Sequence, residues 1–342
     1  MVSSDNPKYI KLSTMATMSP VKRFFNSRVV WGVGGILLLI KFWLKVTTGH
    51  CRSEARLEGR TVVITGANSG IGLETAKELA RRGARLVMVC RDLKKAHIAR
   101  RMITSQTGSS DITVKGIDFC SLASVRKCAK EILAEEDNIH ILLNNAGCAS
   151  GSFTKTSDNL DNLMQANHFG PFLFTNLLLE TIQKSAPSRI INVSSETHRM
   201  AKLDLEHLDL TNTKSEIVAY ANSKLCNVMM ANHLASKLKG KGVTVNSLTP
   251  GVVVTDILRD ASYLTRVVSN TVNGIFCKTL KEGAQTSIFA CVDPRLGDIT
   301  GKYFMDCMET KASAEACDAA KAKKLWTLSE HAVGLQPNER MF

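Results

Sequence analysis

Several patterns that would reveal a function at once are missing from the sequence. No two of its ten cysteines are spaced as Cys-x-x-Cys, so a structural zinc site is not indicated. No run of five or more lysines and arginines occurs, and no RNA-binding signature is present, which argues against nucleic acid despite a formal net charge of +13. The cysteines also lack the spacing of a disulfide framework, so we expect reduced thiols in a reducing compartment.

The composition is that of a folded protein, with 44% hydrophobic and 22% charged residues among 342. Neither an internal repeat nor a low-complexity linker is evident. We expect residues 58–310 to form a single domain. A basic segment, residues 1–28, and a hydrophobic helix, residues 29–46, would precede it, and a tail carrying one exposed helix, residues 311–342, would follow.

The amino-terminal hydrophobic stretch predicts a membrane anchor. Residues 29–40 are all apolar or glycine, and apolar residues continue past Lys41 to Val46. As a helix, about 18 residues would span about 27 Å, close to the hydrocarbon thickness of about 30 Å. A buried helix or a cleaved signal peptide fits the position and late start of the stretch less well. Basic residues on both sides leave the topology open, and the acid-poor first 28 residues also allow a mitochondrial presequence.

From Arg60 onward, strand-like and helix-like segments alternate. Apolar or β-branched runs predict strands at residues 61–65, 85–90, 112–117, 139–143, 189–194, 243–248 and 301–305. Helical spacing predicts helices at residues 71–82, 92–102, 121–133, 159–183 and 217–238. Continuous apolar strands separated by helices predict a parallel sheet covered on both faces. We therefore expect one doubly wound, Rossmann-type α/β domain of about seven strands.

A glycine-rich turn, Thr65–Gly72, follows the first predicted strand. Glycines in such a turn let the chain bend tightly and let a phosphate approach the backbone. The helix that follows offers free N–H groups and a favourable dipole to a pyrophosphate. A glycine trio alone could be an ordinary turn, but the strand before it and the helix after it favour a dinucleotide site. The expected contacts are Gly66, Ser69, Gly70, Ile71 and Gly72.

Tyr220 and Lys224 are four residues apart on a predicted helix, so their side chains point the same way. A free tyrosine has a pKa of about 10, too high for a base at neutral pH. A nearby ammonium stabilises the phenolate and lowers that pKa. The pair could then exchange a proton with an alcohol or a carbonyl oxygen. Such a pair is often only a surface stripe, so its meaning depends on the rest of the sequence.

These features stand in the order found in the short-chain dehydrogenase/reductase superfamily, which the chain resembles over residues 58–330. Matching segments are Thr65–Gly72, Asn144–Gly147, Asn167, Ser195, Tyr220–Lys224 and Pro250–Thr255. The resemblance implies a catalytic group in which Ser195 binds the substrate oxygen, Lys224 also holds the nicotinamide ribose, and Asn167 holds a relay water. It further implies cofactor contacts from Asp118, Asn145, Tyr220, Lys224, Pro250, Gly251 and Thr255.

The end of the second strand indicates which nicotinamide cofactor is used. Relatives that prefer NAD place an acid there to bind the ribose hydroxyls. Here Cys90 occupies that position and Arg91 follows. An arginine would pair with the 2′-phosphate of NADP(H), whereas a carboxylate would repel it. We interpret Asp92 as the cap of the next helix, and we expect NADP(H).

Within the superfamily the sequence is similar to the NADP-preferring retinol dehydrogenase branch, and its layout is closest to the mitochondrial-type member. The stretches that carry this likeness are Gly49–Cys51, Leu57–Gly59, Cys90–Asp92, Asn167–Gly170, Ser185–Ser195 and Glu282–Ser287. Glu196, Pro171 and Ala221–Asn222 depart from the branch. These departures leave the reaction intact but leave retinoid specificity open.

The resemblance implies NADP(H)-dependent interconversion of a lipophilic alcohol and its aldehyde or ketone, of the retinol type and reductive in cells. The expected location is a membrane, with the endoplasmic reticulum ahead of the mitochondrion, and homodimers are common in the superfamily. Steroid, isoprenoid or fatty alcohol dehydrogenases on the same fold are alternatives. A catalytically silent dinucleotide-binding membrane protein is a further alternative, which the complete set of four catalytic-type residues disfavours. We expect neither a metal nor a nucleic-acid partner.

Overall fold

The computed structural model describes residues 35, 39, 41–43, 45–149, 153–208, 215–253 and 277–341. The chain divides into two compact units, residues 1–48 with 261–277 and residues 49–260 with 278–342. In the first unit, Leu39, Phe42, Trp43 and Val46 have exposed side chains. Among the described residues we find no helix with the length and apolar character needed to span a membrane. Most of the predicted anchor, residues 29–46, lies outside the described residues.

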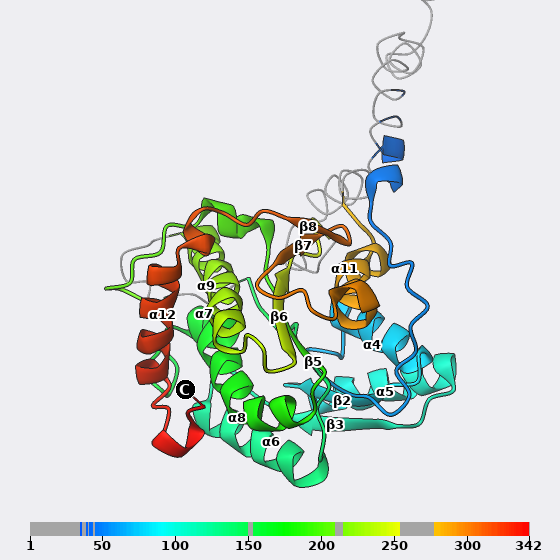
Figure 1. Cartoon of the computed structure of the whole chain (residues 1–342), viewed down its shortest axis with the longest axis horizontal. Helices are drawn as coiled ribbons and strands as arrows, with labels where there is room; N and C mark the ends of the chain where they lie inside the picture. Colours follow the sequence, from blue (N-terminus) through cyan, green and yellow to red (C-terminus); the bar gives the residue numbers. More distant parts are fainter. Residues whose placement is uncertain are drawn as a thin grey trace, which may run out of the picture. The chain divides into compact units, whose positions relative to one another are not determined.

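The second unit is built on one sheet of eight strands (Figure 1). Its spatial order is β3-β2-β1-β4-β5-β6-β7-β8, and every neighbouring pair is parallel except β7 and β8. The seven predicted strands are present, and β8 is an addition that forms a hairpin with β7. The bounds are β1 Thr61–Thr65, β2 Arg85–Cys90, β3 Ile112–Gly116, β4 Ile141–Asn144, β5 Ser188–Val193, β6 Val243–Leu248, β7 Tyr303–Met305 and β8 Met308–Thr310.

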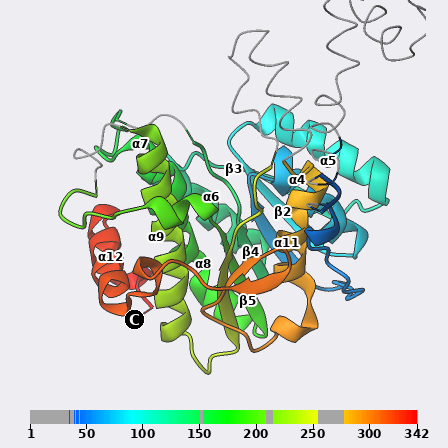
Figure 2. The same cartoon turned by 90° about the horizontal axis from the view of Figure 1, so that it is seen from above.

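Helices cover both faces of the sheet (Figure 2). One face packs against α4 Gly70–Arg81, α5 Leu93–Thr107 and α11 Leu280–Val292, and the other against α6 Leu122–Glu135, α8 Gly170–Lys184 and α9 Glu216–Lys237. Along β1, Val62 and Ile64 enter the core on the first face and Val63 the core on the second. A strand that is buried on both faces carries apolar side chains on both, so its sequence does not alternate between apolar and polar residues. The continuous apolar runs therefore identified a doubly wound sheet correctly.

The helix predicted over residues 159–183 is wrong in its first part. The structure instead has a short α7, Asn162–Met164, a π-helical turn η1, Gln165–Phe169, and then α8. Pro171 explains the interruption, because a proline has no N–H to donate to the carbonyl four residues earlier, that of Asn167. Such π turns are frequent at functional sites, and this one contains a predicted catalytic residue.

The carboxy-terminal helix is not the exposed helix that the sequence predicted. α12, Ala319–Ala332, packs on α9, and its Ala322, Leu325 and Trp326 are buried in the same core. The Trp326 ring meets Phe172 of α8 edge-on at a centroid distance of 4.7 Å. Buried residues at positions 322, 325, 326 and 329 follow helical spacing. Lysines at the positions between them made the helix look exposed from its composition. The tail in fact packs onto the domain.

His168 in η1 gives the fold a pH-dependent stability. It is fully buried, with Nε2 2.9 Å from the Ser329 hydroxyl of α12, and burial lowers the pKa of its imidazole to about 4. An unfolded histidine has a pKa of about 6.5, so between these values the unfolded chain binds more protons. The stabilising contribution of neutral His168 is therefore complete above pH 6.5 and is lost as the pH falls toward 4.

We expect the free energy of unfolding to fall by about 2 kcal/mol between pH 7 and pH 5 through this histidine alone. Denaturant titrations at the two pH values measure the difference. His168→Gln should shrink it, whereas His97→Gln, at an exposed position on α5, should leave it unchanged. An undiminished difference in the His168 variant would assign the effect to another group.

Candidate active site

The glycine turn between β1 and α4 forms a cradle that side chains would fill. Gly66 and Gly70 have φ angles of +70° and +58°, in the left-handed region that glycine tolerates best. A Cβ on Gly72 would lie 2.3 Å from the Gly66 carbonyl oxygen. Ser69 is the exposed N-cap residue of α4, and its side chain makes no capping hydrogen bond. Because Ser69 does not cap the helix, the first N–H groups of α4 are left for a ligand. The partly buried Ile71 side chain packs against the core below the turn.

Asn145, directly after the neighbouring strand β4, supports this turn. Its Nδ2 donates to the Thr65 carbonyl at 2.9 Å, and its backbone N–H donates to the Thr65 hydroxyl at 3.0 Å. The same hydroxyl accepts from the N–H of Ala146 at 2.9 Å. Asn145, predicted as a cofactor contact, therefore lies beside the cradle and fixes its floor.

Replacing Gly72 with alanine is expected to lower the free energy of unfolding by about 2 kcal/mol, because the new methyl group would overlap backbone. It would also lie 2.5 Å from Asn145 Nδ2. Thermal or denaturant unfolding checks this. Gly116→Ala is the matched control, since its Cβ would meet the Leu93 side chain at an ordinary 3.5 Å. Equal stability of the two variants would show that the cradle accommodates a side chain.

Tyr220 and Lys224 lie on α9 next to the end of β5. Lys224 is only 3% exposed, and its Nζ lies 5.5 Å from the centre of the Tyr220 ring. The ammonium donates to the Val193 carbonyl at 3.3 Å, and the Ser194 hydroxyl donates to the Lys224 carbonyl at 2.7 Å. These bonds tie α9 to the strand end that carries Ser195. The predicted tyrosine, which is partly buried, and the buried lysine therefore lie on the same side of α9.

Asn167 joins this group through Gly147. A Cβ built on Gly147 would lie 2.9 Å from Lys224 Nζ and 3.2 Å from Asn167 Oδ1, so both side chains border the same glycine. The Asn167 amide is itself satisfied. Its Oδ1 accepts from the N–H of Cys148 at 2.8 Å, and its Nδ2 donates to the Cys148 carbonyl at 2.8 Å and to the Ser223 hydroxyl at 3.0 Å. Its side chain thus positions the loop and α9.

Ser223 is a residue that the sequence reasoning missed. It is buried, and its hydroxyl donates to the Tyr220 carbonyl at 2.7 Å while accepting from Asn167. A chain of two hydrogen bonds therefore runs from the π turn to the backbone of the predicted catalytic tyrosine. The only signal in the sequence was its place inside the Tyr-x-x-x-Lys segment.

Ser195 is partly buried at the start of η2, Glu196–Met200, and its hydroxyl accepts from the N–H of Thr197 at 3.3 Å. Glu196, the charged departure from the branch, accepts from the Tyr303 hydroxyl at 3.0 Å and pairs with Arg199 at 2.8 Å. Burial, with Glu196 nearby, raises the pKa of the Tyr303 phenol. The Glu196 carboxylate is therefore engaged by partners of its own.

His198 holds the other side of Ser195. Its Nδ1 lies 2.7 Å from the Ser195 carbonyl, and its Nε2 accepts from the N–H of Ser313 at 3.1 Å. Because Nε2 accepts, the proton of the neutral ring belongs on Nδ1. Burial lowers the pKa of His198, which favours this neutral form. The sequence reasoning also missed this residue.

Arg91 is exposed directly after β2, whose last residue, Cys90, is buried. Burial raises the pKa of the Cys90 thiol to about 11, so it stays neutral. Asp92 accepts from the N–H of Lys95 at 3.0 Å and caps α5, which confirms the interpretation of that carboxylate. Arg91 thus carries an exposed positive charge directly after this strand end.

The remaining predicted contacts border the same edge of the sheet or lie outside the description. Asp118 follows β3, and its Oδ1 accepts from the N–H of Cys120 at 2.9 Å, as in an ordinary turn. Pro250 and Gly251 follow β6, with Gly251 at a φ of +81°. Thr255 lies outside the described residues.

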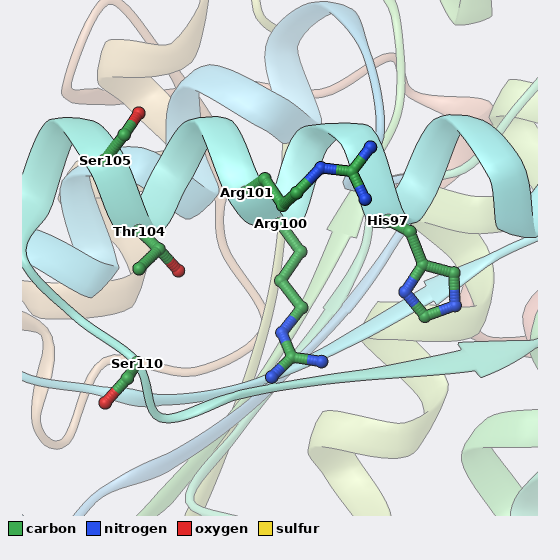
Figure 3. Close-up of a pocket in the computed structure, with 6 residues that line it drawn as sticks. All are labelled: His97, Arg100, Arg101, Thr104, Ser105 and Ser110. Atoms are coloured by element: carbon green, nitrogen blue, oxygen red, sulfur yellow. The ribbon is translucent and has the colours of Figure 1, made fainter.

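A separate hollow of about 400 Å³ lies on α5 (Figure 3). Its lining residues are His97, Arg100, Arg101, Thr104, Ser105 and Ser110. None of the predicted catalytic or cofactor-binding residues lines it. The hollow is therefore distinct from the predicted site at the carboxyl ends of the strands.

Comparison with known proteins agrees with this architecture. The family model described as short chain dehydrogenase matches residues 60–263. Human retinol dehydrogenase 12 is 42% identical over 291 residues, which cover 84% of this chain and 90% of that protein. Human retinol dehydrogenase 13 is 40% identical over 310 residues, which cover 89% of this chain and 93% of that protein.

Two solved structures illustrate the fold. An uncharacterized protein from Mycobacterium paratuberculosis superposes with a TM-score of 0.68 at 29% identity, over 84% of this chain and 98% of that one. L-sorbose reductase from Gluconobacter frateurii, crystallised with NADPH and L-sorbose, gives a TM-score of 0.61 at 20% identity, over 74% and 96%. The second likeness concerns the fold alone.

The parallel sheet, the glycine cradle at the start of α4 and the buried lysine beside a tyrosine define an NAD(P)-binding oxidoreductase. The chain belongs to the short-chain dehydrogenase family. Within that family it is similar over most of its length to retinol dehydrogenases 11 to 14. The family and branch predicted from the sequence are both confirmed.

Proposed function

We propose that this protein is an NADP(H)-dependent oxidoreductase that interconverts a lipophilic alcohol and its aldehyde or ketone, of the retinol and retinaldehyde type. The observation that carries the proposal is the buried Lys224 ammonium 5.5 Å from the Tyr220 ring, beside the end of β5. A cation this close to a phenol stabilises its phenolate form. The retinol dehydrogenases to which the chain is similar support the substrate class.

The protein's residues would handle the proton of the reaction. When bound, the nicotinamide cofactor supplies or accepts the hydride. In reduction, the Tyr220 hydroxyl donates its proton to the carbonyl oxygen, and the phenolate left behind is stabilised by Lys224. The Ser195 hydroxyl donates to the same oxygen and fixes its position. Asn167 holds Cys148 and Ser223 in place and, as the resemblance implies, would hold a relay water near Lys224.

The residues of the cradle fit a dinucleotide. Gly66, Gly70 and Gly72 leave the backbone open to a pyrophosphate, and the uncapped first turn of α4 would donate to it. Arg91 would pair with a 2′-phosphate, and Asp118, Pro250 and Gly251 would border the adenine and nicotinamide ends. An arginine and no carboxylate directly at the end of β2 supports NADP(H) over NAD(H).

The proposal extends to the setting of the reaction. Residues 29–46 would hold the protein at a membrane, the endoplasmic reticulum ahead of the mitochondrion, where lipid-dissolved aldehydes are concentrated. With NADPH in a reducing compartment, carbonyl reduction would be the prevailing direction. A homodimer through the long helices would be consistent with the superfamily.

Substrate profiling tests the proposal. The purified full-length protein in detergent or nanodiscs is assayed with NADPH and with NADH against retinaldehyde, an isoprenoid aldehyde, a fatty aldehyde and a steroid ketone. We expect retinaldehyde reduction with NADPH to have the highest kcat/KM. A clear preference for the steroid ketone would assign the protein to another substrate class. NADPH binding without turnover of any substrate would identify it as a catalytically silent dinucleotide-binding protein.

A further inference from the structure

The turn between β7 and β8 keeps two side chains where the backbone favours glycine. Asp306 and Cys307 have φ angles of +52° and +57°, both in the left-handed region. Two-residue hairpin turns of this conformation favour Asn-Gly, Asp-Gly or Gly-Gly. Aspartate is therefore accepted at the first position, and the backbone strain falls mainly on Cys307 at the second. The contacts of Asp306 show what its carboxylate does in this turn.

Asp306 joins two segments that are far apart in the sequence. Its Oδ1 accepts from the backbone N–H of Gly49 at 3.1 Å and from Lys278 Nζ at 2.5 Å. A Cβ on Gly49 would lie 1.8 Å from the Asp306 carbonyl oxygen, so any side chain there would displace this segment. Cys51 continues the attachment, because its N–H donates to Gln285 of α11 at 3.0 Å. The first residues of the second unit, Gly49–Cys51, are thus fastened to the β7–β8 turn and to α11; they are called the amino-terminal segment below.

Lys278 links Asp306 to the turn at Pro250 and Gly251, which is part of the expected cofactor site. Its Nζ donates to the Pro250 carbonyl at 3.4 Å, and its backbone N–H donates to the Val252 carbonyl at 2.8 Å. A Cβ on Gly251 would lie 2.8 Å from the same Nζ, so the lysine packs directly against this turn. The Lys278 side chain is 15% exposed and that of Asp306 is 22% exposed. A largely desolvated charge pair holds its geometry more firmly than an exposed one.

We propose that Asp306 is a positioning residue that fixes the Pro250–Gly251 turn through Lys278, and that the backbone of Gly49 completes this arrangement. The attachment of the amino-terminal segment is then coupled to cofactor affinity. The inference rests on the proposed function in one respect, namely that Pro250–Gly251 borders the bound cofactor. It assigns the Asp306 carboxylate a role through its bonds to Gly49 and Lys278.

Asp306→Gly tests the positioning role, because it removes the carboxylate at a positive-φ position that glycine also tolerates. In the full-length protein, assayed well below its Tm, we expect the Kd for NADPH to rise about five- to tenfold. Cys307→Gly relieves strain at the adjacent residue and should leave the Kd unchanged. Glu309→Gln breaks the Lys302–Glu309 pair on the same hairpin, at 2.7 Å, and should also leave it unchanged. A wild-type Kd in Asp306→Gly, or an equal rise in both controls, would overturn the proposal.

Gly49→Ala tests the contribution of the amino-terminal segment, since its methyl group would overlap the Asp306 backbone while both side chains of the Asp306–Lys278 pair are retained. We expect the NADPH Kd to rise by a smaller factor than in Asp306→Gly, and wild-type affinity would remove this segment from the coupling. Binding is measured by NADPH fluorescence, independently of any substrate. If the wild-type protein turned over no carbonyl compound while these affinity changes persisted, the proposed function would fail and the positioning role would stand.

Discussion

Tyr220→Phe is expected to lower kcat for carbonyl reduction by about a thousandfold, because it removes the proposed general acid. The Kd for NADPH should change less than twofold, since the ring and its contact with Lys224 are kept. Lys224 would remain buried, with its bond to the Val193 carbonyl intact. Steady-state kinetics with retinaldehyde and a fluorescence titration with NADPH measure the two quantities on one preparation.

Tyr303→Phe is the matched control for this experiment. Its hydroxyl donates at 3.0 Å to Glu196, the residue that follows Ser195 in the chain. We expect a loss in kcat of less than about tenfold, since one hydrogen bond to a charged group is removed away from the reacting atoms. If Tyr220→Phe kept most of its activity, or if both variants lost the same amount, the proton would have to come from another group.

The parts of the site that the sequence predicted are those set by short-range geometry. Tyr220 and Lys224 share a face because four residues make about one helical turn, and Gly66, Gly70 and Gly72 follow from the bend that a strand-to-helix turn requires. Asp92 as a helix cap follows from the same local logic. For these residues the chain neighbours alone decide the conformation, so the spacing was sufficient.

The supporting contacts could not be predicted, because they join residues that are distant in the chain. Asn167 reaches Cys148 and Ser223 only because the helix changes to a π turn before Pro171. His198 binds Ser313, whose position depends on how the tail packs. No periodicity in the sequence encodes such pairings. Pro171 was the one local signal, because a proline inside a helix interrupts its hydrogen bonding.

The same distinction explains the two errors in the outer elements. β8 has three residues. A two-residue turn at Asp306 and Cys307, both with positive φ angles, brings it alongside β7. α12 has a narrow buried stripe within a lysine-rich sequence, and its packing partner is α9. β8 was too short to give a strand pattern of its own, whereas α12 is buried by a tertiary contact, so its composition pointed to the wrong environment.

Arg91→Ala is expected to raise the KM for NADPH about fiftyfold and to leave the KM for NADH within about twofold. A guanidinium pairs with a 2′-phosphate through charge-assisted hydrogen bonds, and NADH has a hydroxyl there instead. Since no carboxylate stands at the end of β2, the variant should lose its preference for NADPH without acquiring a strong one for NADH. Initial rates with each cofactor at saturating aldehyde give the two KM values.

Arg100→Ala separates a specific contact from the general effect of positive charge. Arg100 is exposed on α5 and lines the hollow in Figure 3, so its removal lowers the net charge by the same amount as removal of Arg91. Long-range attraction between exposed charges is screened within about 8 Å at physiological salt. The Arg100 variant should therefore keep the wild-type KM for NADPH. Equal losses in the two variants, or equal effects of Arg91→Ala on both cofactors, would mean that Arg91 makes no direct contact with a 2′-phosphate and that cofactor choice has another origin.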